Sequence, residues 1–414
     1  MAALLTAAVA FAYPLPLLNA SGTPYSIGRS IGTATSRTLR GLLDPRNTNA
    51  TDLWSVLMPY CAPSGNGSEC DALFASSRAA FPDAYDHLRG LADGANVPLR
   101  ALMAFNCADE IHSLRGGFPH AGRWQRSACT ALLDRRDSST AVLAHNEDGG
   151  WCIAPPGGAF MLLARNRSHG APPYVAMVYP AMLPGYAFAG IAASPDPWGY
   201  SVNSEFVVAK QVDVAAGGAC NTFATHSLLG AKSAADAVAL LASLRAATGF
   251  TANIVGFRGD TVSATNVEVG PGARDASVRS VRSGAAIFAH FNQYQRLNGS
   301  GVREYPDVSS DVRASRVASL CRDASGGNSS CDVLAVLGDE GSAPYNIWRD
   351  YSHRAVDHCM TLAAARLRFV GATASAASAG EGGGASSARS ASLDVFTERP
   401  VGVAPRSQWS FALA

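Results

Sequence analysis

The sequence lacks an excess of either charge, which excludes a first class of function. Its 414 residues carry 33 Lys plus Arg against 32 Asp plus Glu, so the formal net charge is +1. Proteins that bind nucleic acid usually present a basic excess or a basic stripe. The apolar fraction of 48% also excludes a wholly disordered chain. We therefore expect a globular protein that binds no nucleic acid.

Two further features are missing. After residue 20 no run of about 18 uncharged apolar residues occurs, so we expect no internal membrane span. There is no Cys-x-x-Cys pair and no His/Cys cluster at zinc spacing, because His353 and His358 are five residues apart, off a shared helical face. The sequence therefore predicts neither a metal site nor a cofactor.

The first twenty residues lack any charged side chain and are almost all apolar. This pattern favours a signal peptide over residues 1–20, although an Ala-rich N-terminal helix is the alternative. Five Asn-x-Ser/Thr glycosylation sequons follow, at Asn49, Asn66, Asn166, Asn298 and Asn328. Together these features predict the secretory pathway, with an extracellular or lysosomal destination.

Nine cysteines fit an oxidising compartment. Cys61 and Cys70 flank a polar, turn-forming stretch, and so do Cys321 and Cys331, so we expect each pair to close a surface loop with a disulfide. The pairing of Cys107, Cys152, Cys220 and Cys359 stays open. An odd total leaves at least one thiol, which is either reactive or an inert buried side chain.

The order of predicted elements indicates a layered protein. Residues 21–113 read as helical, with a clear helix over Pro82–Gly94. Short β-rich runs follow over 129–210, then a capped helix over Ser233–Ala247 and a hairpin turning at Gly259-Asp260. Residues 371–392 are of low complexity and are expected to form a flexible loop. Helices, strands, then helix and strands again predict an α+β, αββα fold.

Cys129 is the cysteine with the most specific surroundings. It opens the strand-like run CTALLD, and a second run ends in HNEDGG, with Asp148 nineteen residues after the cysteine. This layout resembles the acyl-coenzyme A:6-aminopenicillanic acid acyltransferase family of N-terminal-nucleophile hydrolases. The resemblance continues in order through SGTPYSIGRSIG, the segment FPDAYDHLRGLADGANVPLRALMAFN, YPAMLPGYAFAGI, WGYSVNSEFV and AHFNQY, over about residues 21–370.

The resemblance implies a four-layer αββα fold, a helical pro-region and self-cleavage between Ala128 and Cys129. The thiol of Cys129 is then the nucleophile, and its freed α-amine, with an ordinary pKa near 8, acts as the base. A light chain of residues 21–128 and a heavy chain of 129–414 would remain associated. The substrate is expected to be a small molecule with an amide or thioester bond.

The resemblance also assigns roles to other residues. Asp148 matches the Asp that orients the terminal amine, and Asn292 matches the Asn that donates an N–H to the oxyanion. Asn203 lies near a second Asn of the family pattern. Arg313 looks like the Arg beside the thiol in the related bile-salt hydrolases. The alternatives are ordinary, because Asn146, Asn203 and Asn292 could cap turns and Arg313 could be a charge on a helix surface.

Three positions depart from the family pattern. Gln293 follows Asn292 where many relatives have His, Ala128 precedes the nucleophile where Gly is frequent, and Ala181 stands where relatives often have Gly. These changes affect the expected substrate shape more than the chemistry. The favoured activity is hydrolysis of an amide in a small N-acylated amine or amino-acid derivative. The alternatives are an acyltransferase using a thioester such as an acyl-coenzyme A, and an inactive secreted binding protein on the same scaffold.

Overall fold

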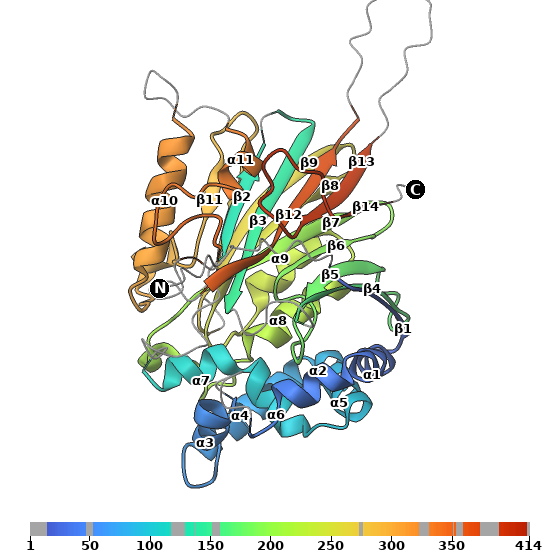
Figure 1. The fold of residues 1–414 in the computed structure, drawn as a ribbon, viewed down its shortest axis with the longest axis vertical. Coiled ribbons are helices and arrows are strands. Elements are labelled where there is room, and N and C mark those ends of the chain that lie inside the picture. The colour runs from blue at the N-terminus through green and yellow to red at the C-terminus, as the bar shows by residue number, and fades with distance from the viewer. Residues whose placement is uncertain are drawn as a thin grey trace, which may run out of the picture.

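A computed structural model describes residues 15–46, 53–116, 129–135, 137–150, 158–272, 276–322, 331–350, 352, 359–372 and 389–411. Its strands form two sheets (Figure 1). The eight-stranded sheet runs in the order β1 (Leu17–Gly22), β4 (Phe160–Asn166), β5 (Tyr174–Val178), β6 (Phe188–Ile191), β7 (Trp198–Ser204), β8 (Phe250–Arg258), β9 (Thr261–Val269), β10 (Ala276–Ser280). The six-stranded sheet runs β11 (Phe288–His290), β2 (Thr130–Asp134), β3 (Thr140–Gly150), β12 (Cys359–Val370), β13 (Ser390–Phe396), β14 (Ser407–Ser410).

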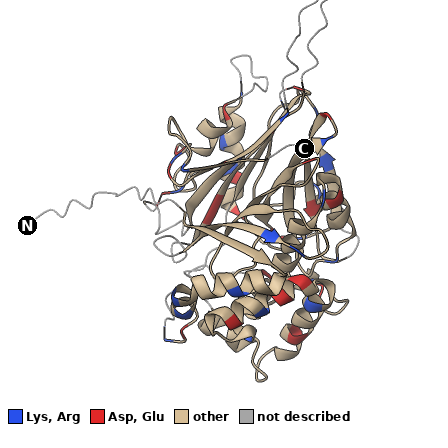
Figure 2. Ribbon diagram, turned by 90° about the vertical axis from the view of Figure 1, so that its right-hand side faces the viewer, with Lys and Arg blue, Asp and Glu red and all other residues tan. Residues whose placement is uncertain are grey.

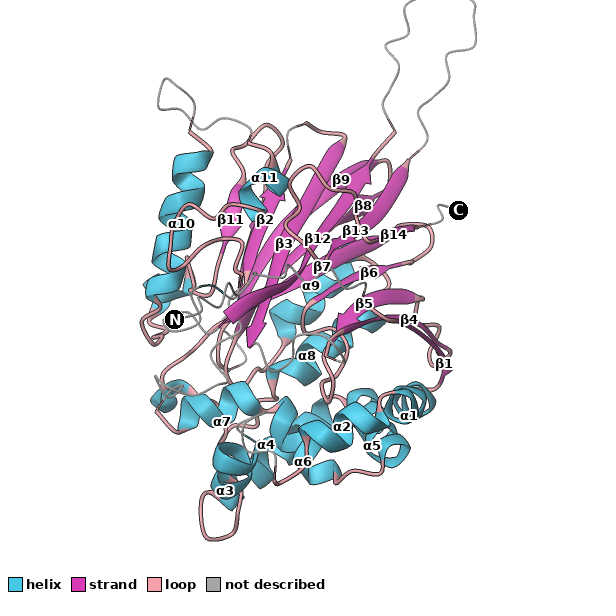
Figure 3. Ribbon diagram, viewed as in Figure 1, coloured by secondary structure: helices cyan, strands magenta, loops and turns pink. Residues whose placement is uncertain are grey.

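Helices cover the outer faces of both sheets, as Figure 3 shows by colour. Those on the side of the eight-stranded sheet are α1 (Pro24–Ala34), α2 (Ser36–Leu42), α3 (Met58–Tyr60), α4 (Gly67–Ala80), α5 (Pro82–Ala95), α6 (Leu99–Asn106), α7 (Ala108–Leu114), α8 (Asn221–Ser227) and α9 (Ala234–Ser243). The six-stranded sheet is covered by α10 (Val308–Leu320) and α11 (Val333–Leu337).

Side chains alternate between the two faces of a strand. Each sheet therefore faces its own helices on one side and the other sheet on the other side, which gives three cores. On β4, Phe160 and Leu162 face the core beneath α1–α9, whereas Met161 faces the core between the sheets. On β2, Leu133 faces the core between the sheets and Leu132 faces α10 and α11. The result is a four-layer αββα arrangement, which confirms the predicted α+β fold class.

Helices α1 and α5 cross at unusually close range because glycines line their contact. A Cβ added to Gly28 would lie 2.0 Å from the His87 carbonyl oxygen, and one added to Gly90 would lie 2.0 Å from that of Tyr25. A side chain at either position would therefore push the two backbones apart. The glycines of the SIGRSIG and LRGLADG segments are thus explained by helix packing.

Most expected elements are present, with two corrections at boundaries. Helix α5 matches the predicted Pro82–Gly94, Ser233 caps α9, and the β8–β9 hairpin turns at Gly259 with φ of 60°. The helix predicted to reach Ala247 ends at Ser243, because residues 245–247 make backbone hydrogen bonds and bridges to other segments instead. The loop expected over 371–392 also ends earlier, because residues 390–392 belong to β13 and pair with β12. Residues 373–388 of this loop lie outside the described residues.

Strand β1 is an element that the sequence analysis missed, because residues 17–20 were expected to belong to a leader and residues 21 and 22 to a helical region. It pairs in parallel with β4, so that Leu17 lies opposite Met161 and Ala20 opposite Ala164. The expected leader boundary at Ala20 falls inside this strand. A leader ending before Leu17 would leave the whole strand in the sheet.

The cysteines that the structure describes form three disulfides. Cys61–Cys70 and Cys321–Cys331 form as predicted, and Cys107–Cys220 joins the α6–α7 junction to the residue before α8. These bridges fit an oxidising compartment such as the secretory pathway. Within the described ranges, no helix is long and apolar enough to cross a membrane. Figure 2 shows basic and acidic residues interspersed, in keeping with the near-zero net charge.

Candidate functional site

Cys129 stands directly before β2, in the interior of the six-stranded sheet between β11 and β3. It is 2% exposed. Its backbone N–H donates to Asn292 Oδ1 at 2.8 Å, and its carbonyl oxygen accepts from Arg313 Nη1 at 2.6 Å and from Asn203 Nδ2 at 3.1 Å. Three residues that the sequence analysis singled out therefore hold the Cys129 backbone, one on β7, one just after β11 and one on α10.

Asn292 uses both ends of its side chain. Oδ1 also accepts from Arg313 Nη2 at 2.9 Å, while Nδ2 donates to the Ser204 carbonyl oxygen at 3.0 Å. The Asn292 backbone N–H donates to Ser310 Oγ at 3.0 Å. One of the two N–H donors of this Nδ2 is thus engaged with a carbonyl oxygen, and the second is the donor that could serve an oxyanion.

Arg313 is fully buried, which excludes the alternative of a charge on a helix surface. Besides Cys129 and Asn292, it donates to Thr130 Oγ1 at 3.1 Å and to the Ser309 carbonyl oxygen at 3.2 Å. Burial lowers the pKa of Arg313 to about 10, with the nearby charge of Arg349 acting in the same direction. The guanidinium therefore remains charged at neutral pH and places a cation beside the Cys129 backbone.

Asn203 belongs to a ladder of three buried asparagines across β7, β8 and β9. Asn253 Nδ2 donates to Asn203 Oδ1 at 2.8 Å, and Asn266 Nδ2 donates to Asn253 Oδ1 at 2.8 Å. Each amide fixes the orientation of the next, so Nδ2 of Asn203 is directed at the Cys129 carbonyl oxygen. The ladder explains why Asn203 is not a simple turn cap.

Asp148 is buried near the end of β3. Its Oδ1 accepts from Thr361 Oγ1 at 2.6 Å, and its Oδ2 lies 3.6 Å from Arg349 Nε. A β-bulge on β12 at residues 361–363 lies opposite Glu147 and Asp148. Asn146, considered as a turn cap, instead donates to the carbonyl oxygens of Leu337 and Ile347.

The other face of β3 carries residues that the sequence reading missed. Glu147 Oε2 lies 3.8 Å from Cys129 Sγ and 2.9 Å from His145 Nε2, and Glu147 Oε1 accepts a short hydrogen bond from the Tyr179 hydroxyl. All four side chains are buried. The signal lay in the HNED run itself, because strand alternation places His145 and Glu147 on one face and Asn146 and Asp148 on the other.

The surroundings of the thiol disfavour its ionisation. Burial raises the pKa of the Cys129 thiol well above its ordinary value, and the charges of Glu147 and Asp148 raise it further. A hydrogen bond from the Asp148 backbone and the charge of Arg313 lower this pKa, but by less. The thiol is therefore neutral at pH 7 and needs a proton acceptor before it can attack a carbonyl carbon.

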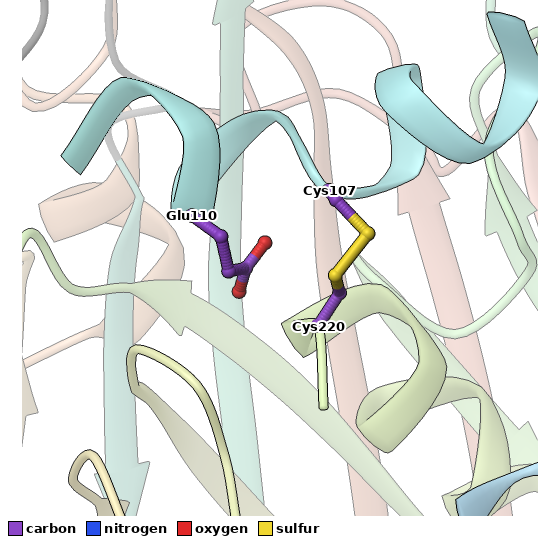
Figure 4. Close-up of side chains that lie close together, drawn as sticks. All are labelled: Cys107, Glu110 and Cys220. Carbon is purple, nitrogen blue, oxygen red and sulfur yellow. A yellow bond between two sulfur atoms is a disulfide. The ribbon is translucent and has the colours of Figure 1, made fainter. Parts of the chain in front are cut away.

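Two clusters contain metal-ligating residue types within the part of the chain that the structure describes. The Cys129, His145 and Glu147 ligand atoms all lie within 4.8 Å of one another, but they already contact one another through hydrogen bonds. Figure 4 shows the second cluster, in which Glu110 lies beside Cys107 and Cys220. Both sulfurs of that cluster are joined in a disulfide, so they offer no thiolate to a metal.

A separate cavity of about 320 Å³ lies away from the thiol. It lies among α1, α5, β4 and α8 and is lined by Ile27, Phe81, His87, Tyr174 and His226, among others. None of its lining residues belongs to the cluster around Cys129. The substrate site is therefore not assigned to it.

Some predicted positions lie outside the described residues, namely Ala128, Cys152 and the sequons at Asn49 and Asn328. The other sequons are described: Asn66 and Asn298 are exposed, and Asn166 is half-buried, with its Oδ1 accepting from the Ser168 N–H at 2.9 Å.

The chain is similar to one known protein family. The family model described as "Acyl-coenzyme A:6-aminopenicillanic acid acyl-transferase" matches residues 135–381, more than half of the chain, beginning just after Cys129. A solved structure titled "Caenorhabditis elegans N-acylethanolamine-hydrolyzing acid amidase (NAAA) ortholog" is similar at 10% identity and a TM-score of 0.38, over 57% of this chain and 92% of that one. No curated protein matches the chain significantly.

Proposed function

The chain belongs to the acyl-coenzyme A:6-aminopenicillanic acid acyltransferase family, and from this premise we propose a self-processing amidohydrolase with Cys129 as nucleophile. The family makes the protein an N-terminal-nucleophile hydrolase or acyltransferase in general. The finer proposal is hydrolysis of the C–N bond in a small N-acylated amine or amino-acid derivative. Cleavage between Ala128 and Cys129 would produce the active enzyme.

One observation carries this proposal: the backbone of Cys129 is held from both sides. Asn292 binds its nitrogen, while Arg313 and Asn203 bind its carbonyl oxygen. An ordinary buried cysteine at the start of a strand has no need of three converging polar side chains. After cleavage the same Asn292 oxygen, 2.8 Å from the nitrogen, would orient the α-amine beside its own thiol.

The reaction would proceed through a thioester. The α-amine of Cys129 accepts the thiol proton, and the sulfur attacks the amide carbonyl carbon of the substrate. The C–N bond breaks as the leaving amine takes up that proton, which leaves the acyl group on sulfur. Water then attacks the thioester, the carboxylic acid departs, and a proton returns to the sulfur. The guanidinium of Arg313 offers a fixed positive charge near these events.

The family description keeps acyl transfer as the second candidate, because an amine can replace water in the last step. Water is present at about 55 M, so an amine competes only where a binding site raises its effective concentration. With an acyl-amide donor and an added amine titrated over the millimolar range, we expect free acid as the main product. Saturable diversion of most acyl groups to the amine would favour the acyltransferase.

Mass spectrometry of the protein purified from a secretory host tests the nucleophile. We expect a heavy chain whose first residue is Cys129. Cys129→Ala should remain a single chain, and Cys129→Ser should cleave slowly, because a hydroxyl performs the same acyl shift less readily. An active enzyme in which residues 128 and 129 are still joined would contradict the proposal.

The same mass spectra test whether the protein passes through the secretory pathway. Three disulfides fit passage through the secretory pathway, and an extracellular or lysosomal destination is proposed on that basis. Sugar attached to Asn66 or Asn298, both exposed, would support this route. A homogeneous protein without glycans from the native source would count against it.

A further inference from the structure

Self-cleavage raises a problem that the mature reaction does not have. In the proposed enzyme the base is the α-amine of Cys129, but before cleavage that nitrogen is a peptide amide, which cannot accept a proton. The thiol pKa is raised by burial, so the precursor needs another acceptor within reach of Sγ. Glu147 Oε2, at 3.8 Å from Sγ, is such an acceptor.

The Glu147 carboxylate is held with one oxygen toward the thiol. Tyr179 donates to Oε1, and His145 Nε2 lies 2.9 Å from Oε2. Burial and the adjacent Glu147 raise the pKa of Tyr179 well above its ordinary value, so its hydroxyl keeps the proton that it donates. The His145 ring packs against Phe188 with centroids 6.3 Å apart, which restricts its rotation.

We propose that Glu147 is the proton acceptor for self-cleavage of the chain, and that His145 and Tyr179 are positioning residues that aim its carboxylate at the thiol. This inference rests on the proposed function. Glu147 would take the proton from sulfur as the sulfur attacks the carbonyl carbon of Ala128. The protonated carboxyl would then give that proton to the Cys129 nitrogen as the C–N bond breaks. Water hydrolyses the resulting thioester and restores the thiol.

Neighbouring groups are less suited to this step. The Asp148 carboxylate binds Thr361 and lies beside Arg349, on the opposite face of β3 from Glu147. The guanidinium of Arg313 is already protonated, so it cannot accept another proton. His145 also has a ring nitrogen within 4.8 Å of the sulfur, but its Nε2 lies 2.9 Å from Glu147 Oε2, so the ring is engaged in holding that carboxylate.

The test separates self-cleavage from turnover. A factor Xa recognition sequence replacing residues 125–128 allows an added protease to expose Cys129 in any variant. Self-cleavage is followed in the natural sequence, and amide hydrolysis is followed in the protease-released enzyme. Glu147→Gln keeps the size and the Oε1 acceptor while removing the charge. Glu398→Gln, which removes a partly exposed carboxylate paired with Arg406, is the matched control.

We expect Glu147→Gln to slow self-cleavage by about 10²-fold or more, the scale of a lost general base. After the added protease has exposed Cys129, the same variant should lose amide hydrolysis by a factor that is at least about tenfold smaller than its loss of self-cleavage. The reason is that the α-amine is then present as the base. Glu398→Gln should leave both rates at the wild-type level. Self-cleavage of Glu147→Gln at the wild-type rate would overturn the inference, and so would equal losses in both reactions.

Two further variants distinguish proton transfer from structural support. Formate should restore part of the self-cleavage of Glu147→Ala by replacing the missing carboxylate, and absence of rescue over the molar range would count against a base. His145→Gln, which can still donate to Glu147, should cleave faster than His145→Leu, and equal rates would remove His145 from the positioning role. A wild-type chain that never cleaves while remaining active would instead refute the proposed function itself.

Discussion

The side-chain oxygen of Asn292 accepts a hydrogen bond from the Cys129 backbone nitrogen, although the two residues are 163 positions apart. The same oxygen accepts from Arg313 Nη2. One amide thus ties the residue that precedes strand β2 to helix α10. Its other end donates to the Ser204 carbonyl oxygen, which makes the donor and acceptor roles of Asn292 separable by substitution.

Asn292→Asp tests which role matters in turnover. Aspartate keeps an oxygen for Cys129 and Arg313 but loses the N–H donor. If that donor stabilises the oxyanion, kcat/KM for amide hydrolysis should fall about 10²–10³-fold while the fold persists. Steady-state kinetics on protease-released enzyme, with the Tm as a check on folding, measure this. A kcat/KM within a few-fold of wild type would remove Asn292 from the oxyanion role.

The raised thiol pKa predicts a pH-dependent reactivity. Alkylation of Cys129 by iodoacetamide should be slow at pH 7 and accelerate as the pH rises, since only the thiolate reacts. Glu147→Gln removes a charge that raises this pKa, so when both proteins are compared in the protease-released form, alkylation of the variant at pH 7 should be faster, by on the order of tenfold per pKa unit. Asp148, Arg313, His145 and Tyr179 remain as the other ionisable neighbours.

Peptide mass spectrometry follows the alkylated Cys129 peptide, with Cys129→Ser as the blank. Reactivity of Glu147→Gln equal to or below that of the wild type would contradict the electrostatic origin of the shift.

The Cys107–Cys220 disulfide would connect the light and heavy chains after cleavage at residue 128. The processed protein should therefore run as one band on a non-reducing gel and as two after reduction. Cys107→Ser/Cys220→Ser should give two bands without reductant. A single band for that double variant would show that cleavage had not occurred or that another bridge joins the chains, and a peptide map including Cys152 and Cys359 decides between these.

The burial of Glu110 leads us to expect that the free energy of unfolding falls as the pH rises. Burial raises its pKa to about 7, with the adjacent Asp109 acting in the same direction. The folded chain therefore holds a proton that the unfolded chain releases above about 4.5, so this group's stabilisation is full below that pH and is lost as the pH rises through about 7. Glu110→Gln keeps the oxygen that accepts from Asn221 and Thr248.

Glu110→Gln should consequently reduce the drop in Tm between pH 5 and pH 8. His112 and His226, whose pKa values burial lowers to about 4, act in the opposite direction below pH 6.5, and they are unchanged in both proteins. Calorimetry across this range provides the comparison. Parallel Tm curves for the two proteins would show that Glu110 does not titrate there.

The layered fold was predictable because its signals are local. Capping at Ser233, the hairpin at Gly259 and two short-loop disulfides each depend on residues close in sequence. The third disulfide was not predictable, since nothing local relates Cys107 to a cysteine 113 residues away. Strand β1 was missed for a related reason, because its partner β4 is far along the chain and its residues resemble an apolar leader.

In the candidate site, too, some features were predictable from the sequence and others were not. The motif around Cys129 and the ordered resemblance identified Asp148, Asn203, Asn292 and Arg313, and the structure brings the last three onto the Cys129 backbone. The contacts of individual atoms could not be predicted from the sequence motifs. Burial of Arg313, the pairing of Asp148 with Thr361 and the approach of Glu147 to the thiol depend on how β3, β12 and α10 stack.

The parallel pairing of β1 with β4 bears on the fate of the light chain. A pro-segment that is discarded after cleavage must leave a surface that water can cover. Here its departure would expose the unpaired N–H and C=O groups along β4 and the apolar face beneath α1 and α5. Such an edge invites pairing with other chains. We therefore expect the N-terminal segment to stay in the sheet after cleavage, and an enzyme stripped of it should aggregate rather than gain activity.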